Sequence, residues 1–190
     1  EKSYNFNPSW LIKLSKLKLW LLEQEKNKLD IIKNYFAELK AEKKFLTSSG
    51  SELTINGKID KIELDKSNNL TVIDYKTGTI PTAKSVLSQS SPQLILSAIL
   101  AKSYIEEKFK QKTKVKSLQY YNVSTSNNGP EVKDIKAENY EDLIEQTEEQ
   151  IEIFTDDLLN FETPFLAFPD RNNLPKYDDY FHLARVEKPE

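Results

Sequence analysis

Two acidic residues and a lysine lie near the ends of two neighbouring predicted strands. The sequence from Gly57 reads GKIDKIEL, a short polar run follows, and the next segment reads TVIDYKTG. Strand side chains alternate between two faces, so Asp74 and Lys76 project to the same side. Asp60 belongs to the preceding strand, and the turn-forming run DKSNN folds one strand back on the other. The two carboxylates and the ammonium group are therefore expected to converge.

Such a convergence suits a divalent metal. Hard oxygen ligands bind Mg²⁺, and a lysine beside them can orient a water molecule or help to deprotonate it. This is the minimum needed for metal-assisted hydrolysis of a phosphodiester. The alternative is an exposed charge pair, which is common and weak on protein surfaces. The apolar neighbours Leu70, Val72 and Ile73 favour the first reading, because they indicate a buried strand in which polar side chains need a reason to be present.

The motifs resemble those of a known family. The pattern GxxD(R/K)(I/V)(D/E), followed by (V/I)IDYKTG and by a helix that begins Pro-Gln-Leu, is typical of the RecB-like nucleases of the PD-(D/E)xK superfamily. The run IDYKTGTIPTAKSVLSQSSPQL, residues 73–94, looks most like the C-terminal nuclease domain of AddB in alphaproteobacterial AddAB helicase–nucleases. The resemblance covers residues 35–186 and implies a restriction-endonuclease-like core.

The resemblance also implies a role for each matching residue. Asp60 and Asp74 match the two metal-binding aspartates, and Lys76 matches the catalytic lysine. The main-chain carbonyl of Tyr75 matches a further metal ligand. Gln93 matches the glutamine that opens the following helix and contacts the site or the DNA.

A third carboxylate ligand is implied upstream, and two residues compete for it. Glu38 is the first choice and Glu42 the second, and both have the same strand parity, so the sequence does not separate them. The implied cofactor is Mg²⁺, with Mn²⁺ as a substitute. The iron–sulfur cluster of some relatives is excluded, because the chain contains no cysteine. Lys61 and Glu63 stand where arginine and aspartate are commoner in the family.

Charge is distributed unevenly along the chain. Residues 1–126 hold 21 Lys and Arg against 13 Asp and Glu, a net charge of +8, whereas residues 127–190 hold 6 against 17, a net charge of −11. This asymmetry predicts a basic face and an acidic face. Lysines on the basic part are expected to contact DNA phosphates, although solvation of surface helices would also explain them. The predicted DNA-binding residues are Lys84, Lys110, Lys112 and Lys114.

The remaining patterns predict an α/β fold with a central mixed sheet flanked by helices. A helix begins at Pro8, strands are expected at 53–64, 70–76 and 115–123, and helices at 92–109 and 139–161. The apolar stripes of the first and last helices are expected to pack in the core. The alternatives are contact with upstream sequence for the first helix and a partner-binding face for the last. Residues 35–45 are ambiguous, because apolar spacing favours a helix and the resemblance favours a strand.

One domain is expected in 190 residues. It divides into a helical lead-in at 1–34, a nuclease core at 35–163 and an extended C-terminal tail at 164–190. The missing initial methionine suggests a piece of a longer protein. No apolar run approaches the length of a membrane span.

The resemblance implies a Mg²⁺-dependent DNA exonuclease domain of a helicase–nuclease that acts in double-strand break repair and recombination. The implied partners are single-stranded DNA ends and an AddA-like helicase–nuclease subunit, and the implied location is the bacterial cytoplasm. The alternative is a non-catalytic DNA-binding or scaffolding module with the same fold. The joint presence of Asp60, Asp74 and Lys76 favours the enzyme, because a charge cluster without a function costs stability.

Overall fold

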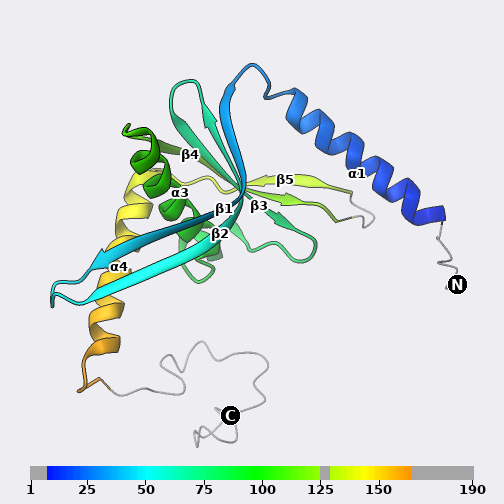
Figure 1. Ribbon diagram of the computed structural model, residues 1–190. Helices are drawn as coiled ribbons and strands as arrows, with labels where there is room; N and C mark the ends of the chain where they lie inside the picture. The colour runs from blue at the N-terminus through cyan, green and yellow to red at the C-terminus, as the bar shows by residue number, and fades with distance from the viewer. Residues whose placement is uncertain (1–7, 125–128, 164–190) are drawn as a thin grey trace, which may run out of the picture.

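Five strands form one mixed sheet in the order β1-β2-β3-β4-β5 (Figure 1). The computed structural model describes residues 8–124 and 129–163. Neighbouring strands are antiparallel except β3 and β4, which are parallel. The strands are β1 (Ile32–Leu46), β2 (Glu52–Asp65), β3 (Asn69–Lys76), β4 (Lys114–Asn122) and β5 (Glu131–Asp134). The predicted mixed sheet flanked by helices is confirmed.

Four helices accompany the sheet in the described part of the chain. They are α1 (Pro8–Lys26), α2 (Ala83–Leu87), α3 (Gln93–Phe109) and α4 (Tyr140–Leu159). The parallel connection from β3 to β4 runs through α2 and α3, as a parallel pair requires a long crossover. Neither α2 nor β5 was predicted from the sequence. The predicted tail at 164–190 lies outside the described residues. No described helix has both the length and the apolar composition that crossing a membrane requires.

The ambiguous segment 35–45 is part of the long strand β1. It pairs with β2 along nearly its whole length, from Ile32 opposite Asp65 to Leu46 opposite Glu52. Tyr35, which the helical pattern would place on the apolar stripe, is 72% exposed. Strand pairing therefore decides the conformation, and local helical spacing does not.

The hydrophobic core lies between one face of the sheet and the helices α3 and α4. Ile62, Val72 and Leu118 face it from three strands and are almost completely buried. Helix α3 lies close to β2, because a Cβ atom added at Gly57 would be only 3.0 Å from Leu100 Cδ1. This packing fixes α3, and hence its first residue, against the sheet.

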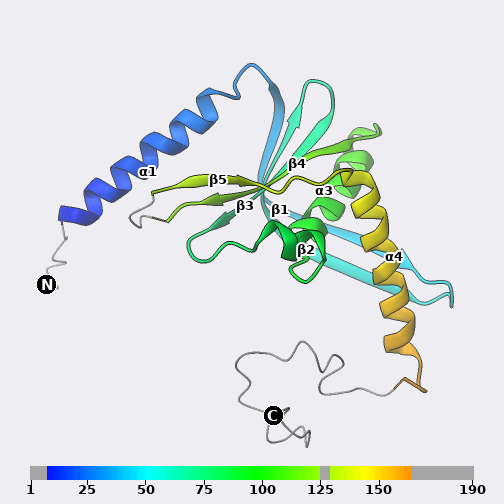
Figure 2. The same ribbon diagram turned by 180° about the vertical axis from the view of Figure 1, so that it is seen from behind.

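The predicted core packing of the two apolar stripes is wrong in part. In α1, Trp10 is 54% exposed and Leu14 is 45% exposed. Figures 1 and 2 show α1 on the side remote from α3 and α4. Its second half contacts the sheet, because the ring of Trp20 packs edge-on against Tyr121 of β4 with the ring centres 5.5 Å apart.

In α4, Leu143 is buried and Phe154 is 65% exposed, whereas the neighbouring Thr155 is only 2% exposed. The buried face of the second half of that helix therefore differs from the predicted apolar stripe.

The other face of the sheet carries a network of charged groups where the chain leaves α1. Lys28 donates hydrogen bonds to both carboxylate oxygens of Glu63, at 2.9 and 2.8 Å, and to the hydroxyl of Tyr121 at 2.7 Å. Lys61 forms ion pairs with Glu63 at 2.9 Å and with Glu25 at 2.5 Å. These contacts hold the end of the α1 region to the strand that carries Asp60.

Candidate active site

The strands β1 and β2 bend together beside the end of β3 (Figure 1). On β2, Ile59 and Ile62 are both buried in the core although they are three residues apart. Alternation of faces is therefore interrupted between them, at Asp60 and Lys61. On β1, Glu38 has a φ of +54°, a left-handed conformation that costs a non-glycine residue about 1–2 kcal/mol. Beyond the bend, β1 and β2 continue as a two-stranded arm, residues 38–60.

The bend brings Asp60 beside Asp74. The last pair between β2 and β3 is Lys61 opposite Ile73, so one further step places Asp60 opposite Asp74. There the side chain of Asp60 replaces the main chain as hydrogen-bond acceptor: its Oδ2 accepts from the main-chain N–H of Tyr75 at 2.9 Å. The two aspartates that the sequence predicted to converge are thus neighbours across two strands.

Lys76 and Gln93 complete a connected group around Asp74. Lys76 Nζ lies 2.9 Å from Asp74 Oδ2 and donates to Gln93 Oε1 at 2.8 Å. Gln93 Nε2 donates to Asp74 Oδ1 at 3.1 Å. Gln93 reaches the site because it is the first residue of α3, which packs on the sheet with that end beside β3. One amide therefore fixes the orientation of both the carboxylate and the ammonium group.

Asp74 is an unusual carboxylate. It is only 6% exposed, and its Oδ2 has the nearby ammonium group of Lys76 but no aligned hydrogen bond from the residues described. Burial raises the pKa of Asp74, the charge of Asp60 raises it further, and Lys76 only partly opposes them. A second cation would relieve both the burial of charge and the repulsion between the two aspartates.

Tyr120 is a member of the site that sequence reasoning missed. It pairs with Asp74 in the parallel register of β3 and β4, and Lys76 Nζ lies 5.8 Å from the centre of its ring. Its hydroxyl is buried and has no partner within the described ranges. Burial, followed by the charge of Asp74, raises the pKa of Tyr120 to about 12. The strand pattern LQYYNV was visible in the sequence, but only the register places this tyrosine beside Asp74.

The structure separates the two candidates for the upstream ligand. Glu38 lies between residues paired with Lys61 and Ile59, and so stands opposite Asp60, whereas Glu42 pairs with Asn56. At about 3.3 Å per residue, Glu42 is roughly 13 Å further along the arm. Glu38 is 62% exposed and forms an ion pair with Lys58.

The predicted DNA-binding lysines lie at two different places. Lys84 is in α2, which precedes the end of α3 that carries Gln93. Lys110, Lys112 and Lys114 lie around the opposite end of α3, and the 17 residues of that helix span about 26 Å. The sequence placed these lysines on the motif-bearing half of the chain, but it did not reveal their distance from Asp74.

The residues present fit a divalent metal bound by carboxylates. No group of three or more His, Cys, Asp or Glu side chains arranged to hold a metal occurs in residues 8–124 and 129–163. Asp60 and Asp74 nevertheless adjoin each other, and the buried Oδ2 of Asp74 has only the ammonium group of Lys76 close to it among the described residues. A third carboxylate would require Glu38 to leave Lys58. The main-chain carbonyl of Tyr75, between Asp74 and Lys76, is the remaining predicted ligand.

Comparison with known proteins identifies a matching family and several relatives of this chain. Residues 6–170 match the PD-(D/E)XK nuclease superfamily. An uncharacterised protein of Rickettsia conorii is 33% identical over 93% of this chain, and one of Rickettsia felis is 30% identical over 93%. The chain spans about a quarter of the length of these relatives, 23% and 24%. The solved structure of SSO0001 is 13% identical, covers 78% of this chain and 62% of its own, and has a TM-score of 0.33.

Proposed function

This chain belongs to the PD-(D/E)XK nuclease superfamily, and we propose that it is a Mg²⁺-dependent DNA nuclease. The observation that carries the proposal is the connected group of Asp60, Asp74, Lys76 and Gln93. Two carboxylates adjoin each other at a strand end, and an ammonium group is fixed beside them by a glutamine. An incidental surface ion pair would not account for the burial of Asp74.

In the proposed reaction each side chain has a separate task. Asp60 and Asp74 would hold the metal, with the carbonyl of Tyr75 and with Glu38 once it is released from Lys58. The bound metal supplies Lewis-acid polarisation of a phosphate oxygen and a more acidic water molecule. Lys76 orients the attacking water and stabilises the negative charge that develops on the phosphate. Gln93 keeps Lys76 and Asp74 in the arrangement that this requires.

We further propose the finer assignment that the motif resemblance suggests. The domain would act as an exonuclease on single-stranded DNA ends within a longer helicase–nuclease, beside an AddA-like subunit, in double-strand break repair and recombination in the bacterial cytoplasm. The span of about a quarter of the relatives' length supports a domain within a larger protein.

Cleavage of end-labelled DNA tests the proposal. The chain should degrade single-stranded DNA with Mg²⁺ or Mn²⁺ and not with EDTA, and Asp74→Asn should abolish the activity. Blocking the ends of the substrate distinguishes the modes, since an exonuclease requires a free end and an endonuclease does not. If the chain binds DNA but cleaves none with either metal, the non-catalytic binding module becomes the better description.

A further inference from the structure

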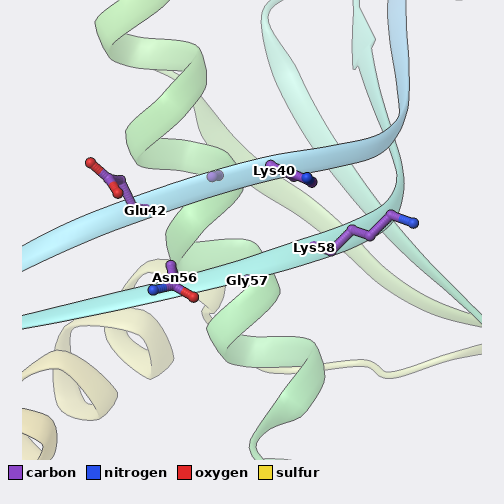
Figure 3. A pocket seen from close by; sticks show the side chains of 6 residues that line it. Lys40, Glu42, Asn56, Gly57 and Lys58 are labelled. Atoms are coloured by element: carbon purple, nitrogen blue, oxygen red, sulfur yellow. The ribbon is translucent and has the colours of Figure 1, made fainter.

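The face of the β1–β2 arm that points away from α3 carries lysines next to the candidate catalytic residues. Lys40 and Lys58 are paired across the two strands, and both are exposed. Lys58 is two residues from Asp60, about 7 Å along the strand. Figure 3 shows both lysine side chains directed along the arm toward the bend, where Asp60 and Glu38 lie.

The same face is hollowed. A depression of about 500 Å³ is lined by residues of both strands of the arm, shown in Figure 3. The lining residues are Lys40, Ala41, Glu42, Asn56, Gly57 and Lys58. At Gly57 the floor of the depression is main chain, because a side chain there would point inward, where Leu100 Cδ1 of α3 lies 3.0 Å from the position of an added Cβ atom. No described helix covers this face, so an extended ligand can reach it.

The charges in the depression favour an anion at the end nearer the bend. Lys40 forms no ion pair with any residue of the described ranges, so its ammonium group is available. Lys58 is paired with Glu38, the carboxylate that the proposed metal would take as a ligand. Glu42 lies further out. The positive end therefore adjoins the proposed reaction centre, and the acidic end is remote from it.

We propose that Lys40 and Lys58 bind the phosphate backbone of the DNA strand beside the phosphate to be cleaved. This rests on the proposed nuclease function and assigns a DNA path over the outer face of the arm. Phosphate contacts by lysine do not depend on base sequence. Release of Lys58 from Glu38 when the metal binds would strengthen the contact, because it removes a competing carboxylate.

Salt-dependent binding of a labelled oligonucleotide in EDTA tests the path without any requirement for cleavage. In Lys40→Ala/Lys58→Ala, the slope of log K against log salt should become shallower by about 1.4 for single-stranded DNA, or about 1.8 for a duplex. Between about 50 and 200 mM salt, the affinity gap between parent and variant should then narrow about sevenfold for single strands. Lys40→Ala alone should give half of the slope change, with no ion pair disturbed.

The matched control is Lys66→Ala/Lys136→Ala, which removes the same charge from exposed positions outside the predicted DNA-binding residues. It should leave the slope nearly unchanged, and Glu42→Gln should strengthen binding. An equal decrease of the salt slope in the two double variants, or a decrease only in the control, overturns the assigned path. Failure of the parent chain to bind DNA overturns the path and the DNA substrate together, whereas binding and cleavage with an insensitive Lys40/Lys58 pair overturns the path alone.

Discussion

The carboxylate of Glu63 holds two lysines on the face of the sheet opposite α3. Glu63 is 3% exposed, and its oxygens lie 2.9 Å from Lys61 Nζ and 2.8 Å from Lys28 Nζ. Burial by itself would lower the pKa of Lys61, but its hydrogen bonds to Glu25 and Glu63 outweigh burial and raise it. Lys61 is therefore charged in the fold, and Glu63→Ala would leave that charge without its buried partner.

Removal of one member of a buried ion pair costs about 3–5 kcal/mol. For a chain of this size each kcal/mol lowers Tm by about 2–4 °C, so Glu63→Ala should lower Tm by roughly 6–20 °C. Urea denaturation and calorimetry measure the loss. The control is Glu25→Ala, because Glu25 contacts the same lysine but its side chain is 49% exposed, and exposed pairs contribute at most about 1 kcal/mol.

A second variant separates charge from packing. Lys28→Met/Lys61→Met/Glu63→Leu removes all three charges and fills the space with apolar groups, and such replacements are often neutral or stabilising. It should recover most of the stability lost in Glu63→Ala. The reasoning fails if Glu63→Ala costs no more than Glu25→Ala, or if the triple variant is as unstable as Glu63→Ala.

Three further predictions concern the site. The pKa of Asp74 is raised in the fold, so without metal its contribution to stability is full below about pH 4 and is lost as pH rises through the folded-state pKa. Over that pH interval the free energy of unfolding of Asp74→Asn should therefore increase relative to that of the parent, as measured by denaturation in EDTA. Mg²⁺ or Mn²⁺ at about a hundred times its Kd should stabilise the parent by about 2.7 kcal/mol, or roughly 5–11 °C in Tm, and should leave Asp74→Asn unchanged. Tyr120→Phe removes a buried hydroxyl without a partner in the described ranges, so it should raise the free energy of unfolding by about 1 kcal/mol in urea denaturation. A decrease of that size in the free energy of unfolding would show that the hydroxyl has a partner.

The sequence predicted the parts of the fold and site that depend on neighbouring residues. Asp74 and Lys76 share a face because they are two apart on a strand. The turn between the strands forms as expected, with Asp65 Oδ1 accepting from the main-chain N–H groups of Ser67 and Asn69 at 2.8 and 2.9 Å. The sequence predicted that Gln93 opens the helix after this strand, and α3 begins at that residue.

The features that the sequence did not reveal depend on distant pairing. Glu38 and Glu42 have the same parity, and only the register of β1 against β2 puts Glu38 opposite Asp60. Tyr120 joins the site through the parallel pairing of β3 and β4. The apolar stripe of α1 predicted burial, but periodicity shows only that a face is apolar and not that the described chain covers it.

The rate of DNA cleavage by Lys76→Met is the most direct test of the proposed catalytic centre. The variant should bind metal and DNA much as the parent does, because Asp60 and Asp74 remain, but cleavage should fall by about 10²–10³-fold. Lys66→Met, which changes an exposed lysine in the turn at the other end of β3, serves as the control and should cleave at the parental rate. If Lys76→Met cleaves within a few-fold of the parent while folded and metal-bound, Lys76 is only a structural partner of Asp74, and the account of the site is wrong.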